Sequence, residues 1–277
     1  MRTLGSAILV LVSLLLAAVA GPAIWAERNI VSEAGFVELA GPLGANTDFQ
    51  QGLSTMVAHQ ASAQLNVPPA LQGLASGIIK SAAQSVYTQP GYAAAWTETL
   101  RRSHALTFAP AADQQGQGDL HLDIAPMVAL VATKVSADMG VTLPTPKQVP
   151  VSLDQPAVAK AIPLVTKLGG LGGWLAFIAV DLLLLAVVVA RKRSATLIWA
   201  GLGMAVVALV WLLGSGFAVD QVNALGAGNE TVAQFGRQIG ARAQASWTWG
   251  INFGFIVAGA LVVAGLIGRM IRRARTT

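Results

Sequence analysis

Four long apolar runs dominate the pattern of hydrophobic and polar positions along this chain. They cover Leu4–Trp25, Leu171–Ala190, Ala195–Ala218 and Trp249–Gly268. The hydrocarbon core of a bilayer is about 30 Å thick, so a helix of roughly 20 apolar residues can cross it. The pattern therefore predicts an integral membrane protein, with a transmembrane anchor over residues 1–26 and a three-helix transmembrane region over 169–277.

Residues 27–168, between the first two runs, have a mainly helical pattern in which apolar residues recur about every 3.6 positions. The expected helices are Phe36–Leu39, one from Asn46 or Thr47 to Leu65, one from Pro68-Pro69 to Tyr87, one from Pro90 to Leu106, Pro126–Met139 and Gln155–Leu168. The alternating stretches Leu120–Ile124 and Gln148–Leu153 read as two strands that pair with each other. The predicted fold class is mainly α with a minor two-stranded β element.

Several side chains indicate where these elements begin and end. Asn46 or Thr47 can cap the second helix, because a side-chain oxygen there accepts a bond from a free backbone N–H. Asp123 can cap the helix that follows it in the same way, and Gly140 suits the end of that helix. Residues 111–118 are rich in Gln and Gly and read as a surface loop.

Two linking segments leave alternatives open. Residues 18–20 resemble a signal-cleavage site, but the apolar run continues to Trp25, which favours an uncleaved anchor. Glycines at 169, 170, 172 and 173 form either a hinge between domain and membrane or a close contact between helices.

The placement of charge predicts which side of the membrane each segment occupies. Eight basic residues without acidic neighbours flank the runs on one side: Arg2, Arg191, Lys192, Arg193, Arg269, Arg272, Arg273 and Arg275. Basic residues near span ends mark the cytoplasmic face. We therefore expect a multi-pass plasma-membrane protein with both termini, loop 191–194 and the tail 269–277 in the cytoplasm. Residues 27–168 and the loop 219–248 are expected outside.

The same charge placement narrows the expected partners. The net charge of +5 comes from the basic residues beside the spans. Membrane topology accounts for those residues, so nucleic acid is not expected as a partner. Membrane lipid is the expected partner, with other membrane or envelope proteins and a homo-oligomer left open. The chain has no cysteine, and no nucleotide-binding motif is present, so we expect no cofactor.

Four sequence stretches resemble a known protein family. They read FVELAGPLG, NTDFQ, WTETLRRSH and LHLDIAPMV, and one anchor helix precedes them while three spans follow. In this order they resemble a family of uncharacterised actinobacterial integral membrane proteins, and the resemblance covers nearly the whole chain. It implies a cell-envelope location and four spans with an extracytoplasmic domain between the first two.

Asp181 is the one ionisable residue that the topology rule does not explain. It lies near the middle of the second span, where an ionised carboxylate costs about 2.5–3.5 kcal/mol. We expect it to face other helices and to be hydrogen-bonded. An ion or proton pathway in an oligomeric transporter or channel is the alternative, but no second ionisable group completes a relay.

The fourth span carries a second candidate for helix packing. Gly250 and Gly254 are spaced as in close helix pairs, and Asn252 lies between them. This spacing predicts close backbone approach and an interhelical hydrogen bond, either within the chain or with another subunit.

An exported hydrolase built from His104, His121 and Asp123, with Ser103 as nucleophile, is a further alternative. The spacing of these residues carries little information, and no glycine-flanked nucleophile turn surrounds any serine. The three histidines are also too scattered to predict a metal site. We expect His104 to pack near its helix end.

Trp96, Arg101 and Arg102 form a small aromatic and cationic group that can meet an anionic polymer or headgroup. The simpler expectation is that the arginines pair with Glu98 or Asp123. Together these patterns predict a non-catalytic envelope protein with an exported binding, sensing or scaffolding domain.

Overall fold

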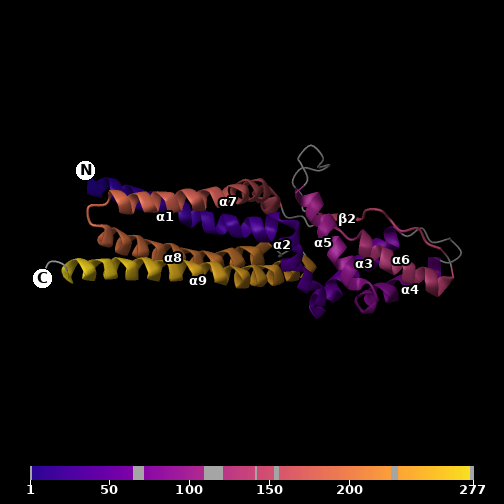
Figure 1. Ribbon diagram of the computed structural model, residues 1–277. Helices are drawn as coiled ribbons and strands as arrows, with labels where there is room; N and C mark the ends of the chain where they lie inside the picture. Colours follow the sequence, from indigo (N-terminus) through magenta and orange to yellow (C-terminus); the bar gives the residue numbers. More distant parts are fainter. Residues whose placement is uncertain are drawn as a thin grey trace. The chain divides into compact units, whose positions relative to one another are not determined.

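The computed structural model describes residues 2–64, 72–108, 121–140, 142–152, 156–225 and 230–274. Over these residues the chain is mainly helical with one two-stranded sheet, so the predicted fold class is confirmed (Figure 1). The chain divides into two compact units. Unit 1 comprises Met1–Arg28, Leu164–Gln221 and Ala241–Thr277, and unit 2 comprises Asn29–Pro163 and Val222–Gly240.

Unit 1 is built from four helices that run side by side (Figure 1). Their bounds are α1 Arg2–Ala26, α7 Pro156–Val189, α8 Arg193–Leu225 and α9 Glu230–Ala274. Four helical stretches are long and apolar enough to cross a membrane: Thr3–Val31, Lys160–Val189, Arg193–Phe217 and Gly236–Ala274. The first runs from α1 into the π-helical turn that follows it. These stretches match the four predicted runs and support a multi-pass membrane protein.

Small residues allow the helices of unit 1 to approach closely. A Cβ added to Gly201 on α8 would lie 2.7 Å from the carbonyl oxygen of Ala258 on α9. The Ser13 hydroxyl on α1 donates to the carbonyl oxygen of Ala179 on α7, at 2.6 Å. Close backbone approach of this kind is typical of transmembrane helices, because their association depends on packing and not on removing apolar surface from water.

The glycine-rich segment at 169–173 is helical and lies within α7. A Cβ at Gly172 would lie 2.8 Å from the backbone nitrogen of Ile24 on α1, and one at Gly169 would meet the Glu27 side chain at 2.6 Å. Of the two alternatives, the structure therefore shows the close helix contact. The expected separate helix Gln155–Leu168 is instead the first part of α7, because none of these glycines interrupts the backbone hydrogen bonding.

Unit 2 contains five complete α-helices among its described residues, together with short 3₁₀ turns and end segments of α7, α8 and α9. The bounds are α2 Glu33–Ala40, α3 Thr47–Gln64, α4 Gln72–Gln84, α5 Tyr92–Phe108 and α6 Ala125–Met139, with 3₁₀ turns at Gly41–Ala45 and Val86–Thr88 and a π-helical turn at Glu27–Val31. All five were predicted. The expected Leu65 end, the Pro68-Pro69 start and the 111–118 loop lie outside the described residues.

The predicted caps determine two of these helix ends. The Asn46 side-chain oxygen accepts from the backbone N–H of Phe49 at 2.9 Å, which satisfies a free donor at the start of α3. Gly140 ends α6 with φ of 67°, a left-handed conformation that other residues adopt only with strain.

The two predicted strands pair. Strand β1, His121–Asp123, is antiparallel to β2, Pro150–Ser152, with Leu122 opposite Val151. Both strands are shorter than expected, and the outermost predicted residues, Leu120 and Leu153, lie outside the described part. α6 connects the strands, as the sequence order required.

One hydrophobic core holds unit 2 together. Its largest fully buried side chains include Leu43, Leu53, Leu100, Ile124 and Met127. Leu43 lies in the 3₁₀ turn at Gly41–Ala45 and Ile124 directly before α6. The other three lie in α3, α5 and α6, and each of these helices contributes one apolar face. This arrangement follows directly from the 3.6-residue period of the sequence.

The segment expected as an outer loop, 219–248, is largely helical. α8 extends to Leu225 and α9 begins at Glu230, which makes them 33 and 45 residues long. A bilayer crossing needs only about 20 residues, so both helices continue beyond the apolar stretch. Ile239 of α9 packs against the unit 2 core, and unit 2 accordingly includes Val222–Gly240.

Candidate functional site

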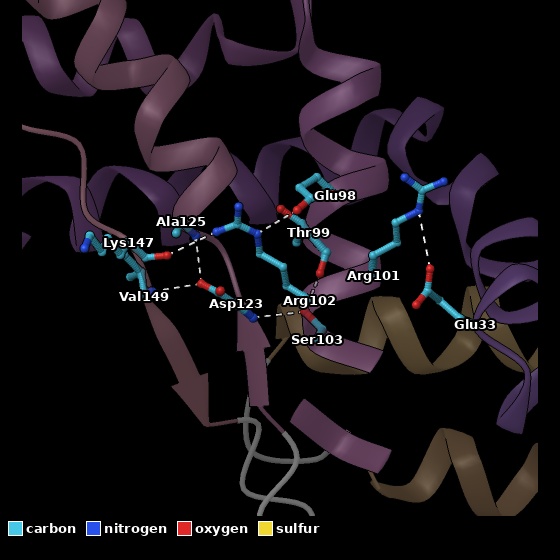
Figure 2. Close-up of polar contacts among 10 residues, drawn as sticks. All are labelled: Glu33, Glu98, Thr99, Arg101, Arg102, Ser103, Asp123, Ala125, Lys147 and Val149. Carbon is cyan, nitrogen blue, oxygen red and sulfur yellow. Dashed lines mark hydrogen bonds and ion pairs between the residues drawn. The ribbon is translucent and has the colours of Figure 1, made fainter. Parts of the chain in front are cut away.

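The Ser103 hydroxyl has a structural role. It donates to the carbonyl oxygen of Thr99 at 2.6 Å, within α5, and accepts from the backbone N–H of Asp123 at 2.9 Å (Figure 2). Its single proton is thus directed at a backbone carbonyl. A nucleophilic serine would need that proton directed at a base, so this geometry joins α5 to β1 instead.

The Asp123 carboxylate connects the start of α6 to the segment before β2. One of its oxygens accepts from the backbone N–H of Ala125 at 3.1 Å and from that of Val149 at 2.8 Å (Figure 2). The residue is only 1% exposed. As expected, the carboxylate accepts a backbone N–H bond at the start of α6, although Ile124 occupies the N-cap position. The second bond explains how a buried acidic side chain is satisfied.

Neither imidazole completes a catalytic set with these residues. His104 is buried, its Nε2 lies 3.1 Å from the carbonyl oxygen of Ile30, and its ring packs between Phe36 and Phe108. The predicted packing of His104 is thus confirmed. The Nδ1 atom of His121 is buried without a partner among the described residues. In that part of the chain, no hydrogen bond joins either ring to Ser103 or to the Asp123 carboxylate.

Trp96 belongs to the core and not to a surface patch. It is 2% exposed, and its indole N–H donates to the carbonyl oxygen of Gly41 at 2.9 Å. Its ring packs against Phe49 with centroids 5.2 Å apart. The expectation that it shares a surface with Arg101 is wrong, because its apolar ring and its N–H both find partners inside unit 2.

The two neighbouring arginines pair with different acids. Arg102 pairs with Glu98 at 2.8 Å, as predicted, and also donates to the carbonyl oxygen of Lys147 at 3.1 Å. Arg101 pairs with Glu33 on α2, at 3.5 Å, and not with Glu98 or Asp123 (Figure 2). Successive residues point about 100° apart around a helix, which directs these two side chains to different neighbours.

Across the described ranges, no three His, Asp or Glu side chains lie together as a metal site would require. A shallow hollow of about 330 Å³ is lined by Arg102, Pro126, Thr145 and Lys147, among others. Its arginine is already paired with Glu98, so the charge there is partly neutralised.

A groove between α3 and α4 is the feature that sequence reasoning missed. It has a volume of about 270 Å³ and is lined by Ser54, Thr55, Ala58, His59, Ser62, Ser76, Lys80 and Gln84. His59 and Lys80 are exposed, and within the described part of the chain neither makes a hydrogen bond or an ion pair. We call this feature the α3–α4 groove.

Residue spacing could have identified the α3–α4 groove. Thr55, His59 and Ser62 follow one another at intervals of four and three, and so lie on one face of α3. Ser76, Lys80 and Gln84 follow at intervals of four on α4. The pairing of α3 with α4 brings these two polar faces together, and only the tertiary structure shows that pairing.

Asp181 is exposed on the outward side of α7 in unit 1. The expected contact with other helices is therefore not made within the described part of this chain. α7 turns its small residues toward the bundle, including Gly172 and Ala179, because only they permit close approach to α1. The carboxyl group has no hydrogen bond among the described residues.

Only one glycine of the predicted pair on α9 lies at a contact with another helix of unit 1 among the described residues. Gly254 packs against α8, where an added Cβ would lie 3.1 Å from Ala208. The three atoms nearest to a Cβ added at Gly250 all belong to Trp247 of the same helix. Asn252 is exposed and makes no interhelical hydrogen bond in the described part of unit 1, so that expectation is wrong within one chain. The polar contact is made instead by Trp211, whose indole N–H donates to the carbonyl oxygen of Ala18 at 2.9 Å.

No protein-family model, curated protein or solved structure matches this chain. The family resemblance therefore stays a prediction, and the function rests on the geometry of the molecule.

Proposed function

We propose that this chain is a non-catalytic integral membrane protein of the cell envelope, whose unit 2 binds a small, hydroxyl-rich anionic ligand outside the membrane. The observation that carries the proposal is the α3–α4 groove, whose lining includes the exposed side chains of His59 and Lys80. Elsewhere in unit 2, Ser103, His104 and Asp123 are used in bonds to the backbone.

Charge placement supports an external position for unit 2. In Figure 1 the start of α1, the turn between α7 and α8 and the last turns of α9 lie at one end of unit 1. The turn carries Arg191, Lys192 and Arg193, and α9 carries three further arginines near its end. Because basic residues flank the cytoplasmic ends of spans, this end belongs in the cytoplasm and residues 27–168 belong outside.

The groove's side chains indicate the chemistry of the ligand. Lys80 supplies a compact positive charge that suits a phosphate or a carboxylate. His59 supplies a ring N–H, and Gln84 can donate to and accept from ligand hydroxyls. The hydroxyls of Ser54, Thr55 and Ser62 donate to backbone carbonyls of α3 and can accept from a ligand. A phosphorylated or acidic sugar presents both kinds of group, and the cavity of about 270 Å³ suits a ligand of that size.

Binding is tested with the full-length protein in lipid nanodiscs, titrated calorimetrically with glucose 1-phosphate and, separately, with uncharged glucose. We expect glucose 1-phosphate to bind and glucose to bind much more weakly. Lys80→Gln should weaken binding about tenfold, since a hydrogen bond to a charged group contributes about 1.5–3 kcal/mol. The matched control is Lys134→Gln, which removes another exposed lysine of unit 2 and should leave affinity unchanged. Equal effects of both variants, or no binding, would contradict the proposal.

The topology is tested separately in intact cells. Since the chain has no cysteine, single cysteines report accessibility without background. Lys134→Cys should react with a membrane-impermeant maleimide, and Lys192→Cys should react only after permeabilisation. The reverse pattern would place unit 2 in the cytoplasm.

A further inference from the structure

The outward side of α7 carries a carboxyl group that makes no hydrogen bond with the described residues of unit 1. Ala179 and Gly172 face the bundle, and Asp181 follows Gly172 by nine residues. At about 3.6 residues per turn, nine residues make two and a half turns, which places Asp181 on the opposite side of the helix. The exposure of Asp181 agrees with this geometry.

A regular stripe of residues surrounds Asp181 on that side. It consists of Gly170, Trp174, Phe177, Asp181, Leu184 and Val188, all exposed. Their intervals alternate between four and three residues, which is the spacing at which two helices pack along a common seam. If this stripe contacted only lipid, the carboxyl group in its middle would have no hydrogen-bond partner.

Lipid chains cannot hydrogen-bond to Asp181, and the described residues of this chain supply no partner for it. Basic residues occur only toward the ends of the four candidate spans, so none lies at the depth of Asp181. A partner must therefore come from another helix in the membrane. Intramembrane carboxyl groups are found facing such partners because exposure to hydrocarbon is unfavourable.

We propose that the stripe on α7 is a homodimer interface, in which Asp181 of each copy pairs with Asp181 of the other. Two copies inserted in the same orientation are related by a two-fold axis along the membrane normal, which places identical residues at the same depth. In its neutral form a carboxyl group has both a donor and an acceptor, so two neutral carboxyl groups satisfy each other. Both copies carry the same four-and-three spacing, so the two stripes can pack against each other along one seam.

The absence of cysteine allows a direct test by disulfide crosslinking in native membranes. Phe177→Cys and Leu184→Cys lie on the stripe, one turn to either side of Asp181. Val206→Cys is the matched control, since Val206 is 60% exposed near the middle of the span on α8. We expect oxidation to crosslink the two α7 variants into dimers and to leave the α8 variant monomeric. Equal crosslinking of all three would indicate random collisions and overturn the proposal.

The role of Asp181 itself is tested in the Phe177→Cys background. Asp181→Leu should reduce crosslinking about tenfold, the size expected for an interhelical hydrogen bond in a membrane. Asp181→Asn should retain most of it, because an amide also carries a donor and an acceptor. Circular dichroism of both variants confirms that the helices remain folded.

Two other outcomes would overturn the homodimer. If Asp181→Asn loses crosslinking as fully as Asp181→Leu and a second protein co-purifies only with the unaltered chain, Asp181 pairs with a basic residue of that protein. If Asp181→Leu crosslinks as well as the unaltered residue, the carboxyl group does not contribute to the interface.

Discussion

The two units of this protein place large and small apolar side chains in opposite ways. Unit 2 buries Leu53, Leu100 and Met127 at its centre. Unit 1 buries mainly small residues, such as Ala186, Ala200 and Ala208, and exposes Trp174, Leu213 and Phe217. The difference shows what surrounds each unit. Water drives large apolar groups inward in unit 2, whereas a lipid environment accepts them and leaves close packing of small residues to hold the helices of unit 1 together.

The largest effect should come from emptying the core of unit 2. Leu100 is 1% exposed, so Leu100→Ala should lower the stability of unit 2 by about 2–5 kcal/mol through lost burial and an unfilled cavity. Hydrogen exchange of α5 and α6 peptides, with the protein in nanodiscs, measures the change. Leu213→Ala on α8, where the side chain is 68% exposed, should change stability by less than about 0.5 kcal/mol. Similar losses in both variants would break the contrast between the units.

Removal of the Asp123 carboxylate should have the next largest effect. Asp123→Ala leaves the backbone N–H groups of Ala125 and Val149 without their acceptor, which should cost about 2–3 kcal/mol. Faster hydrogen exchange at these two amides reports the loss directly. Asp123→Asn retains an acceptor oxygen and should lose less. Asp138→Ala breaks only an exposed pair with Lys134 and should cost under about 1 kcal/mol; a larger loss there than in Asp123→Ala would contradict the structural role.

Two glycines of α8 test the packing of unit 1. Gly201→Ala places a Cβ 2.7 Å from the Ala258 carbonyl oxygen and should destabilise the bundle by about 1–3 kcal/mol. Gly214→Ala meets nothing within 4 Å and should be neutral or slightly stabilising, since alanine favours helices. Thermal unfolding in detergent, followed by circular dichroism, compares them. If both are neutral, close backbone approach does not hold this bundle together.

The smallest effect concerns a buried phenol in unit 2. The Tyr92 hydroxyl donates to the carbonyl oxygen of Gly44 at 2.9 Å, and Tyr92→Phe should cost about 1 kcal/mol. Burial raises the pKa of Tyr92 from 10.0 to about 12. Because the folded pKa is the higher one, the contribution of Tyr92 to stability is complete below pH 10 and declines as the pH rises toward about 12.

Absorbance titration checks the Tyr92 prediction, since the chain has only two tyrosines. Tyr92→Phe should remove the late ionisation, and Tyr87→Phe should leave it in place. A single early ionisation of both tyrosines would show that Tyr92 is not held in a buried site.

Short-range sequence patterns predicted the helices and strands well, but they predicted less well which side chains contact each other. Asn46, Asp123 and Gly140 act where expected, because a cap depends on a few neighbouring residues. Trp96 was misplaced, since its burial depends on Phe49 and Gly41, which lie about 50 positions earlier in the chain. Periodicity shows that a helix has an apolar face but does not show which helix covers it.

The sequence by itself determined the four apolar helices, the charge distribution at their ends, the caps and the paired strands, because each follows from composition, spacing or a short-range hydrogen bond. Only the tertiary structure decided that Ser103 bonds to backbone groups, that two polar helix faces form the α3–α4 groove, and that Asp181 faces away from the bundle. Those features depend on which helix faces meet, and that choice is made by the packing of residues far apart in the chain.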